Sequence, residues 1–197
     1  MPEPILRPHI ILASGSPRRA ELLQQIGVRF LQIPVSLDET PLADEIPQDY
    51  VQRLAIAKAR LGWQQASGEH LPVLGADTTV VLNKRIMGKP ADCNEAVDML
   101  MALSGQTHQV LTAICLVKGE QQLAALVATD VSFRKLGRDE ILAYWQSGEP
   151  ADKAGSYAIQ GLGAVFVNAI NGSYSAVVGL PLMETWELLN TMDALNE

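Results

Sequence analysis

The pattern of apolar and polar residues predicts strands that alternate with helices in the first part of the chain. The expected elements are a buried strand at 9–13, a helix at about 17–26, a strand at 28–35 and a helix from Pro47 toward Trp63. Gly27 is expected to close the first helix in the C′ position. An acidic loop with two prolines separates the second strand from the second helix.

Hairpin signals dominate the rest of the chain. The expected elements are an apolar run at 73–82 interrupted at 75–78, a turn at Asn83-Lys84, a helix from the capping-box pair Asp92 and Glu95 to about Leu103, strands at 107–117 and 123–133 joined near Gly119, a helix at about 138–146, a strand at 165–170 and a last helix from Pro181 toward Leu195. Alternating elements followed by hairpins predict an α/β fold with a mixed sheet.

Between the last two of these strands, residues 152–163 carry several glycines and polar side chains, which is typical of a loop rather than of core. Such a loop is suited to closing over a flat ligand, because glycine lets backbone approach a base. The amide of Gln160 offers both a donor and an acceptor, the pairing that a pyrimidine edge needs. The alternative is an ordinary connecting loop.

The composition points to one globular domain spanning residues 1–197. The chain has 48% hydrophobic and 19% charged residues, enough apolar material for a core, and it shows no repeat and no linker. Its formal net charge is −7, which argues against a broad electrostatic grip on nucleic acid. Any anion that the protein binds must therefore be held locally.

The cysteines and the apolar runs indicate a cytoplasmic protein. The two cysteines, Cys93 and Cys115, are too few for a disulfide framework, and they lack the spacing of a zinc site. The start, Met1 to Ala13, has too short an apolar run for a signal peptide, and no stretch approaches the roughly 20 apolar residues of a membrane span.

The strongest local signal is the segment 14–19, Ser-Gly-Ser-Pro-Arg-Arg, between a strand and the first turn of a helix. Free backbone N–H groups and the positive end of the helix dipole make such a position an anion site, which hydroxyl and guanidinium groups strengthen. The segment lacks the Gly-Lys-Ser/Thr ending of the ATPase P-loop. The alternative is a serine N-cap followed by proline and two solvated arginines.

Asp77 is the second signal, because a carboxylate is costly to bury inside an apolar strand. At a strand end that faces a ligand crevice, such a residue can deprotonate a water or hold a divalent cation. The alternative is an aspartate that ends the strand and caps a turn with Thr78.

Other polar residues are weaker candidates. Lys58 and Lys89 are possible counter-charges for phosphate, although a lone helical lysine such as Lys58 is usually solvated. Asp38 and Glu39 carry the hard oxygen ligands that Mg²⁺ prefers, but acidic loops are usually just solvated. His108 lies on an expected strand, and a structural role is expected for it.

Taken in order, these motifs resemble the Maf family of nucleotide pyrophosphatases. The motifs are Ala13 to Arg19, Gly75 to Thr78, Gly88-Lys89-Pro90, Ser104-Gly105 with His108 and Val110, Asp152 to Gly161, Gly172 to Tyr174, and Val178 to Leu182. The resemblance spans about residues 13–182. It implies an elongated mixed β-sheet flanked by helices, with two lobes around a central cleft, as in the Maf and ITPase-like folds.

The resemblance also implies an activity. It indicates a house-cleaning enzyme that splits a nucleoside triphosphate, in this branch dTTP or UTP and also modified pyrimidine nucleotides, into monophosphate and pyrophosphate with Mg²⁺ or Mn²⁺. The implied residues are Asp77 as proton acceptor, Arg18, Thr78 and Gln160 for specificity, Ser14, Arg19, Lys58 and Lys89 for phosphate, and Glu39 with Asp77 for the metal.

Two other functions stay open on the sequence. One is a nucleotide-binding regulator of cell division without turnover, which the family's name suggests, and the other is a sugar nucleotidyltransferase. Both would use the same anion site. The expected partner is a nucleoside triphosphate, with neither nucleic acid nor membrane, and a homodimer is compatible with the resemblance.

Overall fold

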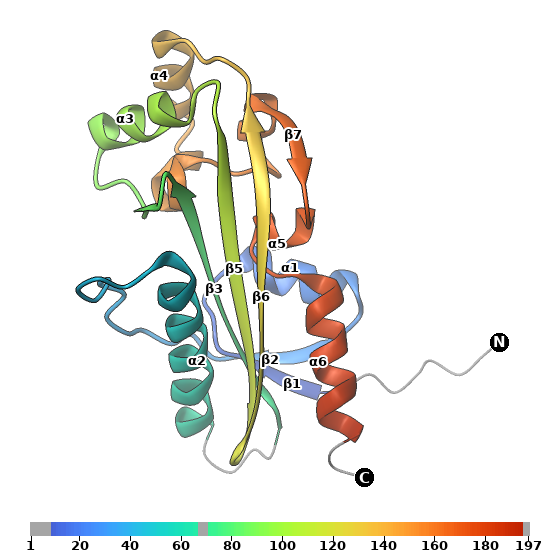
Figure 1. Ribbon diagram of the computed structural model, residues 1–197. Helices are drawn as coiled ribbons and strands as arrows, with labels where there is room; N and C mark the ends of the chain where they lie inside the picture. Colours follow the sequence, from blue (N-terminus) through green and yellow to red (C-terminus); the bar gives the residue numbers. More distant parts are fainter. Residues whose placement is uncertain (1–8, 67–70, 195–197) are drawn as a thin grey trace, which may run out of the picture.

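The computed structural model describes residues 9–66 and 71–194 (Figure 1). The strands are β1 (His9–Leu12), β2 (Arg29–Gln32), β3 (Val73–Leu82), β4 (Arg85–Met87), β5 (Thr107–Lys118), β6 (Gln121–Phe133) and β7 (Val167–Asn171). The helices are α1 (Pro17–Gln25), α2 (Pro47–Gln65), α3 (Cys93–Leu103), α4 (Arg138–Gln146), α5 (Tyr174–Val178) and α6 (Leu182–Ala194). None of the described helices has the length and apolarity needed to cross a membrane.

In this part of the chain, seven strands form one mixed sheet. Their order is β2-β1-β3-β5-β6-β7, and β4 pairs with β3 at the side. β1 runs parallel to both β2 and β3, whereas every pairing from β3 onward is antiparallel. The predicted α/β class with a mixed sheet is therefore confirmed.

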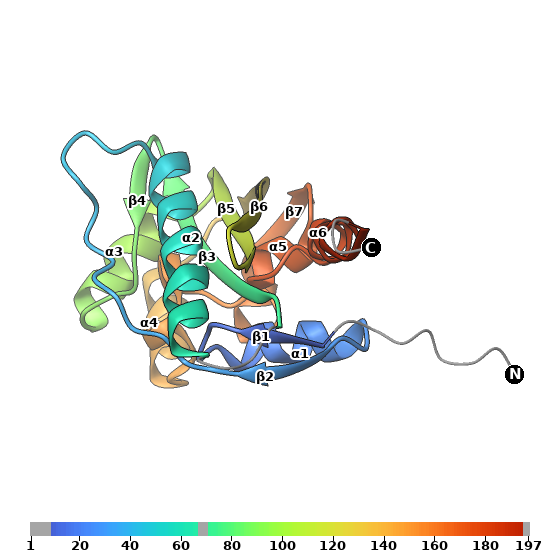
Figure 2. The same ribbon diagram turned by 90° about the horizontal axis from the view of Figure 1, so that it is seen from below.

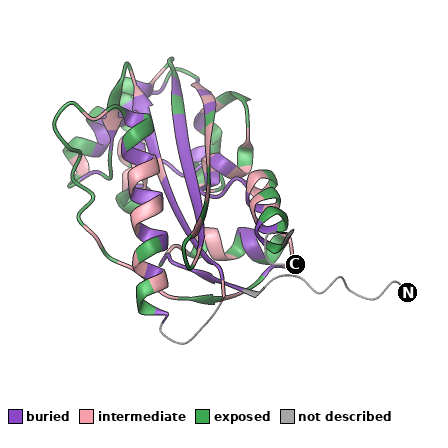
Figure 3. Cartoon of the chain, turned by 60° about the horizontal axis from the view of Figure 1, so that its bottom comes forward, coloured by how far each residue is buried: buried purple, intermediate pink, exposed green. Residues whose placement is uncertain are grey.

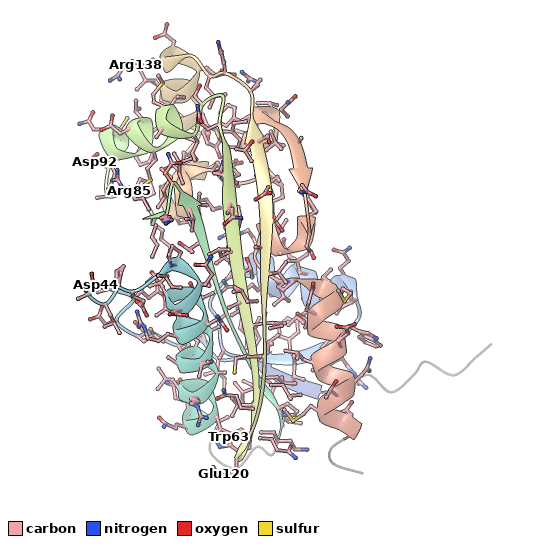
Figure 4. All side chains as sticks on the ribbon, in the orientation of Figure 1. Asp44, Trp63, Arg85, Asp92, Glu120 and Arg138 are labelled. Atoms are coloured by element: carbon pink, nitrogen blue, oxygen red, sulfur yellow. The ribbon has the colours of Figure 1, made fainter. Side chains whose placement is uncertain are left out.

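The long β5–β6 hairpin makes the molecule elongated. Figure 4 shows the Glu120 turn at one end and Arg138 at the other. In Figure 1, α2 and α6 flank one half of the hairpin, while α3 and α4 cover its other end. The sheet thus runs through two lobes, as the resemblance implies.

Local sequence signals predicted several element ends correctly. Gly27 has φ +65, its N–H donates to the carbonyl of Gln24, and the N–H of Val28 donates to the carbonyl of Leu23, which is the Schellman pattern. Asn83 and Lys84 both have positive φ, as the two central residues of a type I′ hairpin turn require.

The capping box of α3 differs slightly from the prediction. The carboxylate of Asp92 accepts the N–H of Glu95 at 3.0 Å, as expected. The carboxylate of Glu95, however, accepts the N–H of Ala91 at 2.7 Å, so the return bond is made one residue earlier than in the standard motif.

Two expectations were wrong, and one element was missed. β3 passes through residues 75–78 without a break, because all of them pair with β5, so Asp77 lies in mid-strand rather than at a strand end. Residues 155–159 are buried, so the loop at 152–163 is partly core. The short helix α5 was not predicted. The expected end of the last helix at Leu195 lies outside the described residues.

Strand β5 is an inner strand of the sheet and is buried on both faces, which explains its apolar run (Figure 3). Val110, Ile114 and Leu116 pack in the cluster formed with α1, α3 and α6. Leu111 and Ala113, on the opposite face, pack against α2. The core therefore consists of two layers with the sheet between them.

Gly75 sets the distance between α2 and β3, which lie side by side in Figure 2. A Cβ at this position would overlap the carbonyl oxygen of Ala55 and the backbone nitrogen of Ala59. Both are backbone atoms of α2 and have little freedom to move. The absence of a side chain at Gly75 thus allows the helix to rest directly on the strand, which brings Lys58 close to Asp77.

We expect Gly75→Ala to lower the free energy of unfolding by about 2 kcal/mol, because the added methyl group forces α2 away from the sheet. Chemical denaturation measures the change. Gly88→Ala is the matched control, since a Cβ at Gly88 meets nothing within 4 Å. Equal stability of the two variants would contradict the close packing.

Candidate active site

A cleft of about 360 Å³ opens between the β1–α1 connection, α2, β3 and the segment that follows α4. The structure brings all nine predicted site residues to its lining: Ser14, Arg18, Arg19, Glu39, Lys58, Asp77, Thr78, Lys89 and Gln160. They come from positions far apart in the sequence. The roles assigned to them stay predictions, but their convergence on one cleft is a feature of the fold.

Arg19 is fixed by three hydrogen bonds and is not a solvated side chain. Its Nε donates to the carbonyl of Gly179 at 2.9 Å, Nη1 donates to Ser14 Oγ at 3.2 Å, and Nη2 donates to Thr78 Oγ1 at 3.3 Å. Burial lowers the pKa of Arg19, although the charge of Asp77 opposes the shift. The side chain stays cationic, because a free guanidinium titrates far above neutrality.

The segment before α1 has the form of an anion site rather than of a side-chain cap. Ser16 occupies the N-cap position but makes no side-chain capping bond, and Pro17 begins the helix. The N–H of Ser16 donates to Ser14 Oγ at 3.2 Å instead. The N-terminal end of α1, which has no side-chain cap, therefore faces the cleft together with the buried hydroxyl of Ser14.

Lys58 joins two carboxylates at the floor of the cleft. Its Nζ lies 2.7 Å from Asp77 Oδ1 and 2.6 Å from Glu39 Oε1. Lys58 and Asp77 are both buried, whereas the side chain of Glu39 is 46% exposed. The lysine is thus a buried ion-pair partner and not the solvated helical residue that sequence statistics favour.

Asp77 has the electrostatic setting of a general base. Burial raises its pKa above the usual aspartate value, while the positive charges of Lys58 and Arg19 act in the opposite direction. A raised pKa makes a carboxylate a better proton acceptor. The neighbouring cations favour the ionised form and so oppose the effect of burial.

Glu39 is held over the cleft by α2. The hydroxyl of Tyr50 donates to the backbone carbonyl of Glu39 at 3.0 Å, and Arg53 binds both carboxylate oxygens of Glu45 further along the same loop. Burial by itself raises the pKa of Glu39, but the hydrogen bond and charge of Lys58, with the charges of Lys89 and Arg19, outweigh it and lower the pKa.

The carboxylates of Glu39 and Asp77 suit an ion such as Mg²⁺ only if the substrate supplies further oxygen ligands. Glu39 and Asp77 approach the same nitrogen, so their oxygens lie close to each other. In residues 9–66 and 71–194, no group of three or more His, Cys, Asp or Glu side chains has the arrangement of a metal site. One or two carboxylates completed by phosphate oxygens and water are, however, the usual ligands of Mg²⁺.

The three predicted specificity residues line the same cleft and come from different elements. Arg18 extends from α1 and lies 3.8 Å from the carboxylate of Asp152. Thr78 contacts Arg19 and the hydroxyl of Thr112, which lies 3.0 Å away. Gln160 is exposed on the segment after α4. Within the described residues the side-chain amide of Gln160 has no hydrogen-bond partner, so it is available to a ligand.

Sequence reasoning missed some contributors to the cleft. The carbonyl of Gly179, the hydroxyl of Tyr50 and the side chain of Thr112 all hold site residues in place. Their residue types carry no signal by themselves. His108 is buried, lies 2.8 Å from the hydroxyl of Tyr157, and has a pKa that burial lowers to about 4, which fits the expected structural role.

This fold and this cleft define an α/β protein whose ligand site is lined by positively charged side chains around one buried carboxylate. The chain belongs to the family of Maf-like proteins, whose family model matches residues 9–192. The resemblance seen in the sequence is thereby confirmed.

Curated relatives cover nearly the whole chain. A dTTP/UTP pyrophosphatase of Pseudoalteromonas atlantica is 55% identical over 190 residues, which are 95% of this chain and 99% of the relative. A dTTP/UTP pyrophosphatase of Escherichia coli K12 is 55% identical over 188 residues, 95% of each chain. A solved nucleoside-triphosphatase from Mycobacterium abscessus aligns with 95% of this chain and 98% of its own at 14% identity, with a TM-score of 0.44.

Proposed function

We propose that this protein is a nucleoside triphosphate pyrophosphatase that hydrolyses dTTP and UTP to the monophosphate and pyrophosphate. The observation that carries the proposal is the buried carboxylate of Asp77, which lies in a cleft also lined by Arg19, Lys58 and Lys89. The names of the relatives that are 55% identical over 95% of the chain support the same substrates.

The cationic side chains hold the triphosphate in the proposed mechanism. Arg19 and Lys89, with Ser14 and the open N-terminus of α1, neutralise and orient phosphate oxygens. Glu39 and Asp77 would hold a divalent ion such as Mg²⁺ or Mn²⁺, which supplies further charge neutralisation of the phosphates when bound. Phosphoryl transfer needs little covalent chemistry from the protein, so positioning and charge account for most of the catalysis.

Asp77 supplies the proton acceptor. It takes one proton from a water molecule as the water oxygen attacks the α-phosphorus, and the bond from that phosphorus to the bridging oxygen breaks. Pyrophosphate leaves with the electron pair of that bond. Lys58 donates to Asp77 Oδ1, so this bond fixes the orientation of the carboxylate and leaves its other oxygen for the water.

A panel of nucleotides tests the proposal. Each canonical triphosphate, and a set of modified pyrimidine triphosphates, is incubated with the protein and Mg²⁺ or Mn²⁺, and the release of pyrophosphate is measured. We expect turnover of dTTP and UTP above that of the purine nucleotides. If no nucleotide of the panel releases pyrophosphate although nucleotide still binds, the protein is instead the regulator without turnover.

The side-chain amide of Gln160 is proposed to read the pyrimidine base. Replacing it by a carboxylate keeps the shape but removes both N–H donors, so Gln160→Glu should lower the preference for dTTP over dATP by about tenfold or more. The ratio of kcat/KM for the two nucleotides measures the effect. Gln146→Glu, at the end of α4, is the matched control, and an unchanged ratio in Gln160→Glu would refute base reading.

The remaining expectations belong to the same proposal. The formal net charge of −7 argues against nucleic acid as a partner. The nucleotide substrates support a cytoplasmic location. A homodimer is compatible with the family resemblance, and sedimentation of the purified protein measures the assembly directly.

A further inference from the structure

Gln160 is carried by a tight turn whose two ends are held from outside the cleft. The N–H of Gly161 donates to the carbonyl of Ala158 at 3.2 Å, which leaves Ile159 and Gln160 as the central residues of the turn. Ala158, Ile159 and Gln160 all line the cleft. The position of the Gln160 amide therefore depends on what fixes the ends of this turn.

Tyr144 of α4 holds the first end. Its hydroxyl accepts the N–H of Ala158 at 3.1 Å, and the side chain is buried. The ring packs edge-on against Phe166, with 4.9 Å between the ring centres. The hydroxyl is thus presented to Ala158 by a ring that has no freedom to swing away.

Glu149 holds the second end. Its Oε2 accepts the N–H of Leu162 at 2.8 Å, and its Oε1 accepts the N–H of Gly163 at 3.0 Å. Oε1 also accepts the hydroxyl of Tyr144 at 2.6 Å, so the two side chains form one connected unit. Neither side chain belongs to the lining of the cleft.

Two glycines, one at the end of the turn and one two residues beyond it, pack closely against this pair. A Cβ at Gly161 would overlap the carboxylate of Glu149, and a Cβ at Gly163 would lie 2.8 Å from the hydroxyl of Tyr144 and from the carbonyl of Ala158. The glycines that suggested a loop in the sequence therefore serve close packing. The segment is held rigidly where Gln160 projects from it.

The charge of Glu149 strengthens the hold. Burial by itself raises the pKa of Glu149, but the hydrogen bonds from Tyr144, Gly163 and Leu162 and the charge of Lys153 outweigh it, and the pKa is lowered. The carboxylate therefore stays ionised at neutral pH. Hydrogen bonds to a charged acceptor are about twice as strong as those between neutral groups.

We propose that Glu149 and Tyr144 are positioning residues for nucleotide selection, which hold the turn at 158–161 so that Gln160 meets the base. This inference rests on the proposed function. Both side chains are proposed to influence which nucleotide binds. They act through the backbone of the turn and do not contact the substrate or the reacting atoms.

The test begins with Glu149→Gln, in which an amide N–H₂ faces backbone N–H donors or the Tyr144 hydroxyl. We expect the KM for dTTP to rise about tenfold and the preference for dTTP over dATP to fall by a similar factor, with kcat changed less than about threefold. Glu140→Gln is the matched control. It removes a charge from the same region of the chain, where Glu140 pairs with Arg134 at the surface.

Tyr144→Phe provides a second variant that keeps the ring packing and removes only the hydroxyl. The same fall in selectivity is expected, to a smaller degree. In a double-mutant cycle with Gln160→Ala, each substitution should add almost nothing to the selectivity already lost, because all act through one amide. Additive losses, or a fall in kcat with selectivity intact, would show a merely structural role and overturn the inference.

The unchanged enzyme separates the two proposals. If it lacks a preference for dTTP and UTP, the proposed function and this inference both fail. If it has the preference and both Glu149→Gln and Tyr144→Phe retain it, only the inference fails. Hydrogen exchange of the backbone at 158–163 adds a readout that needs no nucleotide, and faster exchange in both variants is expected.

Discussion

Asp77→Asn should retain the fold and bind nucleotide but lose about two to four orders of magnitude in kcat for dTTP. The substitution keeps the size of the side chain and removes the group that accepts the proton of the attacking water. Lys58 keeps its second partner, Glu39, so the cation does not become unpaired. Initial rates of pyrophosphate release, together with equilibrium binding of the nucleotide, separate loss of chemistry from loss of affinity.

The pH dependence gives this prediction a second readout. Only the ionised form of Asp77 can accept a proton, so activity is lost as the pH falls through its folded-state pKa. Burial raises that pKa, which should move the acidic limb of kcat/KM above the usual aspartate value of about 4.

An aspartate on another strand serves as control. Asp130→Asn changes the same side chain on β6, where Asp130 accepts a hydrogen bond from Gln109 at the surface. It should leave kcat within about twofold of the parent. Turnover of Asp77→Asn within tenfold of the unchanged enzyme, or an acidic limb that persists in that variant, would remove Asp77 from the role of base.

Lys58→Met should be the most destabilising of the site substitutions, with a loss of about 3 kcal/mol in the free energy of unfolding at neutral pH. The methionine fills a similar volume but leaves the carboxylate of Asp77 buried without its cation. The cleft admits water and Glu39 is half-exposed, which places the loss at the low end of the range for broken buried ion pairs. Denaturant unfolding measures it.

Acid should partly rescue this variant. Without the lysine, the folded-state pKa of Asp77 rises still further above its unfolded value of about 4, so the carboxyl group takes up a proton on folding. Stability is then lowest at high pH and is regained as the pH falls through the folded-state pKa. Lys118→Met, at the end of β5, is the control, and a Lys58→Met protein whose stability loss does not change between about pH 8 and pH 5 would contradict the buried pair.

Much of the fold could be predicted because its signals are local. The bounds of α4 and the long β5–β6 hairpin follow from the spacing of apolar residues, and the positive φ angles at Gly27 and Asn83 follow from residue type at a turn. The segment at 14–19 was also interpretable, since it combines a strand, a turn and a helix start within a few residues.

The strand through Asp77 shows where local reasoning fails. An aspartate two residues after Gly75 suggests an interruption, because both residues weaken an isolated strand. The tertiary structure overrides this preference: Gly75 makes room for α2, and Lys58 of that helix neutralises the carboxylate two residues further along. Neither compensation can be seen in the strand's own residues.

The order of the predicted elements, their amphipathic faces and the residue types available for chemistry can be inferred from the sequence. Which of those residues meet depends on the folded chain, as with Arg19 and the carbonyl of Gly179, 160 positions away. The physical reason is that periodicity and turn chemistry act over a few residues. The meeting of distant side chains depends on sheet register and on how closely a helix can approach a strand.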